Sequence, residues 1–209
     1  AKRASAPAQI NIPRDMWTQV IDIDLPAMVE FERPSGGDNA ISEAAEMLSS
    51  SKNPIILNGA GVVLSEGAID ASKALAERLD AAVCVGYQHN DAFPGSHPLF
   101  AGPLGYNGSK AAMELIKDAD VVLCLGTRLN PFSTLPSYGI DYWPKDAKII
   151  QVDINPDRIG LTKKVSVGII GDASLVASKI LSKLSDTAGD FDRTERKQKI
   201  AEIKSRWAQ

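Results

Sequence analysis

Five residues of this 209-residue chain have types and positions that could contact a nucleotide: Gly59, Gly61, Arg128, Asp153 and Asp172. Each lies at the end of an apolar run, or shortly after one. Glycine amides at the start of a helix can bind phosphate. A guanidinium can fork onto a phosphate or stack on a base, and a carboxylate can accept hydrogen bonds from ribose. Together the five predict a nucleotide-shaped crevice.

Each candidate also has a purely structural interpretation. Gly59 and Gly61 lack the third glycine of a dinucleotide fingerprint, so a tight turn that packs a helix on a strand explains them equally well. Arg128 could form an ion pair with Asp153 or Asp172, and Asp153 could cap the turn that follows it. The residues alone therefore indicate a nucleotide-binding-like domain whose use stays open.

Cysteine and histidine show no pattern of catalysis or metal binding. Two Cys and two His are too few for a disulfide scaffold or a closed zinc site. Cys84 and Cys124 lie inside apolar runs and are expected to be buried small hydrophobes. His89 and His97 share a loop that has no recognisable nucleophile. The cysteines and histidines therefore give no sign of a catalytic nucleophile or of a zinc site.

The elements that position these residues alternate along the sequence. Helical stripes separate the apolar runs, and two long loops are expected at 86–108 and 127–146. Continuously apolar strands that alternate with helices are typical of a parallel sheet covered on both faces. The prediction is a doubly wound, mostly parallel six-stranded α/β sheet, Rossmann-like, with helices on both faces. Strands are expected at 54–57, 82–85, 121–126, 148–153 and 165–170.

Composition excludes several classes of partner. The formal charge is −3, with 44% hydrophobic and 23% charged residues, as in ordinary globular proteins. Without a basic excess there is no electrostatic case for nucleic acid or an anionic membrane. No apolar run approaches the length of a bilayer span, and no secretory leader is visible, so a cytoplasmic location is predicted.

Four segments together resemble the central domain of thiamine-diphosphate-dependent enzymes, the group that includes acetohydroxyacid synthase, pyruvate oxidase and oxalyl-CoA decarboxylase. They occur in the order of the family and cover roughly residues 38 to 185. The last two are the most specific. The segments are 54–61, 97–108, 119–128 and 150–173.

The resemblance implies that the chain is a piece of a longer protein. Residues 1–19, with a strand at 9–12, are similar to the tail of a preceding pyrimidine-binding domain, and 20–37 form a linker. Residues 38–185 are the central Rossmann-like domain, and 186–209 a linker helix toward a diphosphate-binding domain. The remaining domains of the parent enzyme are then its partners. The intact enzyme is expected to be a homodimer or homotetramer.

The resemblance also implies a reaction and its cofactors. Segments 9–19 and 87–94 are most similar to the branch that converts sulfoacetaldehyde and phosphate to acetyl phosphate and sulfite. Thiamine diphosphate and Mg²⁺ would be bound outside this chain, because the Gly-Asp-Gly motif of the family has no match here. The nearest strings are 37–39 and 171–173. The resemblance also places the catalytic Glu of the family in the preceding domain. The fragment alone is therefore expected to be inactive, with no catalytic residue and no metal ligand of its own.

The central domain of relatives binds ADP, FAD or nothing, and either outcome is open here. The resemblance maps the nucleotide contacts onto the same five residues as the residue-level argument. Two other functions compete with the acetyltransferase. One is a free-standing FAD- or ADP-binding module, and the other is the central domain of a related enzyme such as acetolactate synthase. A NAD-dependent deacylase is disfavoured, because two cysteines cannot form its four-cysteine zinc site.

Overall fold

The computed structural model describes residues 7–184 and 193–207, in two units that divide between Arg33 and Pro34. In the first unit only the short 3₁₀ helix η2 (Arg14–Met16) is regular. The strand predicted at 9–12 is wrong for this chain, since the segment is extended without a pairing strand. A lone strand leaves its backbone groups to water and gains little. The apolar side chains of this segment are exposed.

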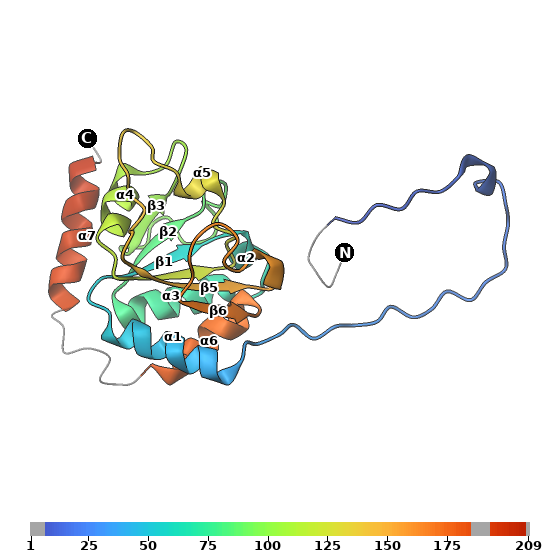
Figure 1. Cartoon of the computed structure of the whole chain (residues 1–209), viewed down its shortest axis with the longest axis horizontal. Coiled ribbons are helices and arrows are strands. Elements are labelled where there is room, and N and C mark those ends of the chain that lie inside the picture. Colours follow the sequence, from blue (N-terminus) through green and yellow to red (C-terminus); the bar gives the residue numbers. More distant parts are fainter. Residues whose placement is uncertain (1–6, 185–192, 208–209) are drawn as a thin grey trace. The chain divides into compact units, whose positions relative to one another are not determined.

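The second unit is built around a six-stranded sheet, as predicted (Figure 1). Every neighbouring pair is parallel, and the strand order is β3-β2-β1-β4-β5-β6. The central strands β1, β2 and β4 are buried throughout, which explains their unbroken apolar runs. The strands are β1 (Pro54–Asn58), β2 (Ala82–Val85), β3 (Phe100–Pro103), β4 (Val121–Leu125), β5 (Lys148–Asp153) and β6 (Val167–Ile170).

The sixth strand, β3, lies inside the segment that the sequence predicts as a long loop at 86–108. Its four residues include Gly102 and Pro103, which are unfavourable in a strand interior and hide the pattern. They are tolerated because β3 is an edge strand, with an irregular register beside Val83 and Cys84 of β2. The prediction of a continuous loop here is therefore corrected.

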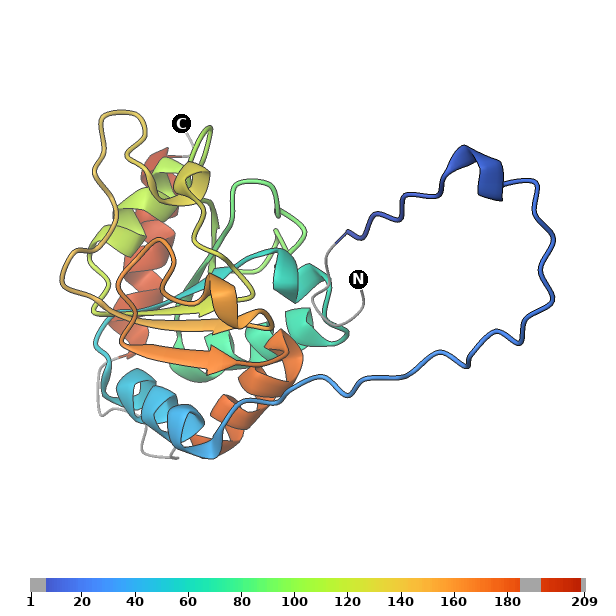
Figure 2. The ribbon, with the colours of Figure 1, turned by 45° about the vertical axis from the view of Figure 1, so that its right-hand side comes forward.

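Helices cover both faces of the sheet, as Figures 1 and 2 show. Helices α1, α3 and α6 pack together on one face, and α4 and α7 lie together on the other. No helix among the described residues is long and apolar enough to cross a membrane. The helices are α1 (Asp38–Ser50), α2 (Ala60–Val63), α3 (Ala68–Leu79), α4 (Lys110–Lys117), α5 (Pro131–Thr134), α6 (Ala173–Lys183) and α7 (Arg193–Trp207), with a 3₁₀ turn η3 (Pro156–Arg158).

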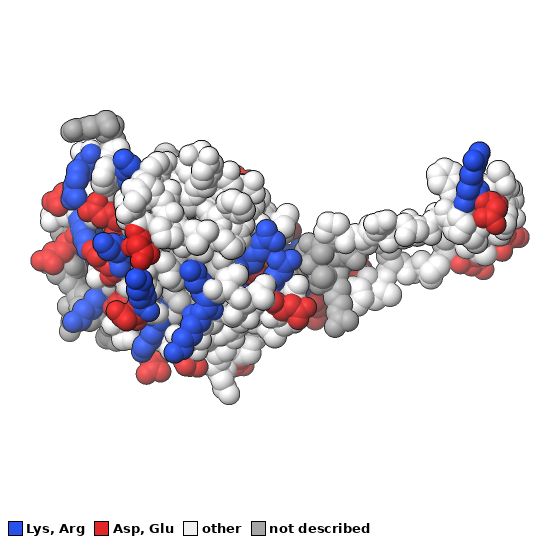
Figure 3. Space-filling model, turned by 45° about the horizontal axis from the view of Figure 1, so that its top comes forward, with Lys and Arg blue, Asp and Glu red and all other residues white. Residues whose placement is uncertain are grey.

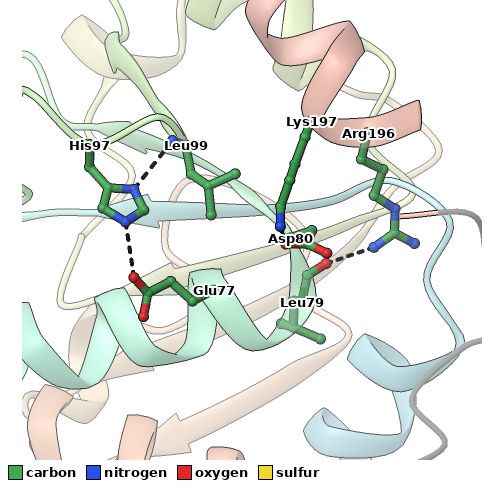
Figure 4. A network of polar contacts seen from close by, with 7 residues as sticks. All are labelled: Glu77, Leu79, Asp80, His97, Leu99, Arg196 and Lys197. Atoms are coloured by element: carbon green, nitrogen blue, oxygen red, sulfur yellow. Dashed lines mark hydrogen bonds and ion pairs between the residues drawn. The ribbon is translucent and has the colours of Figure 1, made fainter. Parts of the chain in front are cut away.

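Helix α7 packs against the rest of the second unit through both apolar and polar contacts. Ile200 and Ile203 of this helix are buried. The Arg196 guanidinium donates to the carbonyl oxygens of Ser51 and Leu79, each at 2.7 Å. These carbonyls belong to the ends of α1 and α3, where helices leave carbonyls without internal partners. Arg196 therefore joins α7 to the amino edge of the sheet, the edge where the strands begin (Figure 4).

A second polar junction at the amino edge is centred on Asp120, just before β4. Its carboxylate accepts hydrogen bonds from the Ser51 hydroxyl and from the backbone N–H groups of Lys52 at 2.7 Å and Asn53 at 2.9 Å. Burial raises the pKa of Asp120, but these hydrogen bonds outweigh it, so the pKa is lower than usual. The ionised carboxylate therefore stabilises the turn between α1 and β1.

We expect Asp120→Asn to lower the free energy of unfolding at pH 7 by about 1–2 kcal/mol, because an amide accepts these bonds less strongly. A lowered folded-state pKa contributes stability above the unfolded value, and the contribution is lost as pH falls through the folded value. The difference between wild type and variant should therefore shrink in urea unfolding as pH drops below about 4. Asp118→Asn is the control, since Asp118 makes an exposed ion pair with Lys199. A difference that stays constant with pH would contradict the prediction.

Candidate functional site

The residues predicted to form a nucleotide crevice lie at the carboxyl edge of the sheet, the edge where the strands end. Strand order reverses between β1 and β4, and ligands of doubly wound sheets bind at such a point. Gly59 and Gly61 follow β1, Arg128 follows β4, and Asp153 ends β5. The structure therefore brings these four residues to adjacent strand ends.

The two glycines allow close backbone packing against the end of β4. The N–H of Gly59 donates to the Leu125 carbonyl at 2.9 Å, and that of Gly61 to the Gly126 carbonyl at 2.8 Å. A Cβ on Gly61 would lie 2.6 Å from the Gly126 Cα. Both N–H groups thus have backbone partners, and α2 is a single turn of four residues. The packing-turn interpretation describes what these glycines do in the structure, and their contact with phosphate stays a prediction.

Arg128 and Asp153 differ in their surroundings. The Arg128 side chain is exposed, and its backbone carbonyl accepts a bond from the Thr162 hydroxyl at 3.4 Å. Asp153 is half-buried and accepts from the Asn155 N–H at 2.9 Å, which is the turn-capping role. Burial raises the pKa of Asp153, opposed by that bond and by the charge of Arg158. Arg158, rather than Arg128, is therefore the cation that acts on Asp153.

Asp172 is buried and serves as the N-cap of α6. One carboxylate oxygen accepts from the N–H groups of Ser174 at 3.0 Å and Leu175 at 3.3 Å, and from the Ser65 hydroxyl at 2.6 Å. Such a cap satisfies helix N–H groups that would otherwise lack partners. Asp172 thus links the α2–α3 connection to α6, and its nucleotide role stays a prediction.

Two buried amides that the sequence analysis did not single out hold the loops of this edge. Gln151 of β5 donates to the carbonyls of Thr127 and Arg158, each at 3.1 Å, and accepts from the Gly160 N–H at 2.9 Å. Asn58 of β1 exchanges bonds with the Ser72 hydroxyl and donates to the Ala92 carbonyl at 3.0 Å. The sequence offered one sign of them, since Gln151 interrupts an apolar run and Asn58 ends one. A buried amide requires hydrogen-bond partners, so such a residue points to contacts with neighbouring loops.

The His97 side chain holds the loop before β3 in place, and its two ring nitrogens contact Leu99 and Glu77. Its Nδ1 accepts from the Leu99 N–H and its Nε2 contacts the Glu77 carboxylate, both at 3.2 Å (Figure 4). With Nδ1 accepting, Nε2 carries the proton and donates to Glu77. The ring also meets Phe93 edge-on at 5.2 Å. Both ring nitrogens thus have partners that position this loop.

The cysteines are buried, as expected, and metal ligands do not gather in the described residues. Burial raises the pKa of the Cys84 thiol to about 12 and also raises that of Cys124. Neither thiol is therefore activated as a nucleophile. Within residues 7–184 and 193–207, no three His, Cys, Asp or Glu side chains are placed to hold a metal ion.

The two acidic strings closest to a diphosphate motif also do not fit a bound cation. Asp38 lies in the first turn of α1 and forms an ion pair with Lys179 at 3.6 Å. Asp172 caps α6, as described above. Both carboxylates are therefore engaged within the fold. That thiamine diphosphate and its metal are bound outside these residues stays a prediction.

Residues 41–180 match the family model described as thiamine pyrophosphate enzyme, central domain. The whole chain is 76% identical, over 209 residues, to sulfoacetaldehyde acetyltransferase of Roseovarius nubinhibens, of which it covers 34%. It is 30% identical to an acetolactate synthase large subunit of Corynebacterium glutamicum over 84% of the chain and 28% of that protein. The chain thus spans about a third of the length of these curated relatives.

A solved structure shares the fold. Benzoylformate decarboxylase from Polynucleobacter necessarius superimposes with a TM-score of 0.66 and 24% identity, over 82% of this chain and 32% of that one. At this identity the likeness shows the fold alone. It confirms the doubly wound α/β architecture.

Proposed function

This chain belongs to the thiamine pyrophosphate enzymes, whose central domain it forms, and from that premise we propose that its parent converts sulfoacetaldehyde and phosphate to acetyl phosphate and sulfite. The observation that carries the proposal is the 76% identity, over the entire chain, to a sulfoacetaldehyde acetyltransferase. Identity to an acetolactate synthase large subunit is 30% over a shorter span. The first assignment is therefore favoured over acetolactate synthesis.

Within this proposal the chain supplies a scaffold and not the reacting groups. Thiamine diphosphate, when bound, provides the electron sink for acyl transfer. The carboxylates tested above do not fit the Mg²⁺ that would accompany it, so we place both cofactors in the rest of the polypeptide. The cytoplasmic location and the dimeric or tetrameric state are proposed with the parent enzyme.

The proposal is tested with the polypeptide extended to the full length of its relatives. We expect it to release acetyl phosphate and sulfite from sulfoacetaldehyde and phosphate when thiamine diphosphate and Mg²⁺ are added. The 209-residue chain alone should release neither and should not bind thiamine diphosphate in calorimetry. Acetolactate formed from pyruvate, with no sulfite from sulfoacetaldehyde, would instead identify the parent as an acetolactate synthase.

A second proposal concerns the crevice at the carboxyl edge. We infer that an adenine nucleotide, ADP or FAD, would contact the exposed Arg128 with its phosphates and Asp153 with its ribose. Gly59, Gly61 and Asp172 complete the predicted set, although their amides and carboxylate already have partners within the fold. Acetyl transfer to phosphate needs no net redox step, so FAD here would have a structural role.

Calorimetric titration of the chain with ADP and with FAD tests this second proposal. Arg128→Ala should bind the nucleotide about tenfold more weakly than wild type, since a guanidinium–phosphate contact contributes roughly 1–3 kcal/mol. Lys164→Ala is the matched control, because Lys164 is an exposed cation on the neighbouring loop. If Arg128→Ala binds the nucleotide as tightly as Lys164→Ala, Arg128 does not contact it. No heat with either nucleotide would leave the crevice a purely structural feature.

A further inference from the structure

Exposed apolar side chains of the second unit gather at one edge of the sheet. Within residues 34–184 and 193–207, the large apolar side chains that are exposed lie almost entirely on segments that follow a strand at its carboxyl end. The amino edge carries instead the paired charges of α7. The exposed residues are Val63, Leu64, Tyr106, Phe132, Leu135, Tyr138, Leu161, Ile170, Leu175 and Trp207.

Part of this set forms an aromatic patch, defined here as Tyr87, Tyr106, Phe132, Leu135 and Tyr138. The Tyr87 ring stacks on the Phe132 ring, with 6.2 Å between the ring centres, and contacts the Tyr106 ring edge-on, with 6.1 Å between the centres. The last four residues are 53–64% exposed. Figure 3 shows an uncharged area over the upper part of the second unit, on the side where Figure 1 places α5, whereas charged side chains lie on the α7 side and across the lower part of this view. Exposed apolar surface of this kind marks an interaction site.

The loops that carry the patch are held in place. The Tyr106 N–H donates to the Phe132 carbonyl at 3.0 Å, and the Tyr87 N–H to the Ser133 hydroxyl at 3.2 Å. Gly105 permits this contact, because a Cβ there would lie 1.7 Å from the Phe132 oxygen. The patch is therefore built by hydrogen bonds between three loops and does not depend on a covering partner for its shape.

The end of α7 lies beside the patch. The Lys110 ammonium, in the first turn of α4, lies 5.3 Å from the centre of the Tyr138 ring and 5.1 Å from that of Trp207. Trp207 also donates to Glu114 at 2.7 Å. A central domain in a protein of which this chain covers about a third has polypeptide on both sides. The last residue of α7, Trp207, lies close to Tyr138 of the aromatic patch, with Lys110 between the two rings.

We propose that the aromatic patch is the docking surface for the domain that follows α7 in the full-length protein. The occupant would present an apolar protein surface, because the patch offers ring faces and exposed aliphatic surface. The proposal rests on the proposed function only in requiring a longer parent polypeptide of this family. It does not depend on which substrate that parent uses.

Nitration of Tyr106 and Tyr138 by tetranitromethane, read by peptide mass spectrometry, tests the proposal in three polypeptides. These are the chain itself, the chain extended only at its N-terminus, and the full-length protein. Both tyrosines should react readily in the first two. In the full-length protein their rates should fall about tenfold or more, because a packed interface core excludes reagent.

A matched pair of variants locates the contact. Leu135→Asp in the full-length protein should restore nitration of Tyr106, whereas Leu175→Asp should not, since Leu175 is an exposed leucine on α6. Both variants of the 209-residue chain should keep the wild-type melting temperature, which shows that the patch itself is intact.

Three results would overturn the proposal. Equal nitration in all three polypeptides would leave the patch uncovered. Protection by the N-terminal extension alone would assign it to the preceding domain. If the two tyrosines of the 209-residue chain become more protected as the protein concentration rises, the aromatic patch binds a second copy of the chain. The acetyl phosphate assay is read separately, so an inactive full-length protein with protected tyrosines contradicts the proposed function alone.

Discussion

Gly126→Ala is expected to lower the free energy of unfolding by about 3 kcal/mol, since a left-handed non-glycine residue costs about 1–2 kcal/mol and overpacking adds a similar amount. Gly126 has a φ of +57°. A Cβ there would lie 2.5 Å from the Gly61 Cα and 2.9 Å from the Val62 nitrogen. These are backbone atoms, so no side chain can rotate away. In a chain of this size the melting temperature should fall by roughly 10 °C.

Gly139→Ala is the matched control for Gly126→Ala. Gly139 has a similar φ of +73°, but nothing lies within 4 Å of the position of its Cβ. It should therefore lose only the conformational part, about 1–2 kcal/mol. Equal losses in the two variants would mean that the contact between β4 and the turn after β1 relaxes without cost. The packing role of the glycine pair would then be refuted.

Gln151→Leu is expected to cost about 3 kcal/mol, because each buried polar group left without a partner costs about 1 kcal/mol or more. The substitution keeps a side chain of similar size at a buried position. It removes the partners of the Thr127 and Arg158 carbonyls and of the Gly160 N–H. Urea unfolding measures the loss of stability. Hydrogen exchange at the Gly160 amide should increase more than at amides of β1.

Gln198→Leu provides the comparison for Gln151→Leu. Gln198 is exposed on α7, and a surface substitution there should change stability by less than about 0.5 kcal/mol. If the two leucine variants unfold at the same urea concentration, water or a shifted loop replaces the amide of Gln151. The loops after β4 and β5 would then not depend on this side chain.

Much of the fold could be predicted from periodicity, because a sheet buried on both faces imprints unbroken apolar runs on its strands. β1, β2, β4 and β5 are found where the sequence predicts them, with helices between them. β3 could not be found in this way. Its stability comes from pairing with β2 at the sheet edge, a tertiary contact that overrides the unfavourable Gly102 and Pro103. The strand predicted at 9–12 failed for the opposite reason, since no strand among residues 7–184 and 193–207 pairs with it.

The location of the candidate residues could be predicted from the sequence, but their hydrogen-bond partners could not. Strand ends identify where Gly59, Arg128 and Asp153 meet, because parallel strands end at a common edge. The sequence cannot reveal that the Gly59 amide is taken by the Leu125 carbonyl, or that Asp172 caps α6. Such pairings depend on distances between loops, which only the assembled fold determines.

The docking of α7 has a consequence for how this unit folds during synthesis. All six strands have been translated by Ile170, but Arg196 bonds to carbonyls at Ser51 and Leu79, more than a hundred positions earlier. While the ribosome still holds the C-terminal segment, those carbonyls and the surface that later covers Ile200 and Ile203 stay open to solvent. Because only the part of the chain that has left the ribosome can fold, we expect the sheet to form first on the nascent chain and α7 to dock on it once residues 193–207 have left the exit tunnel.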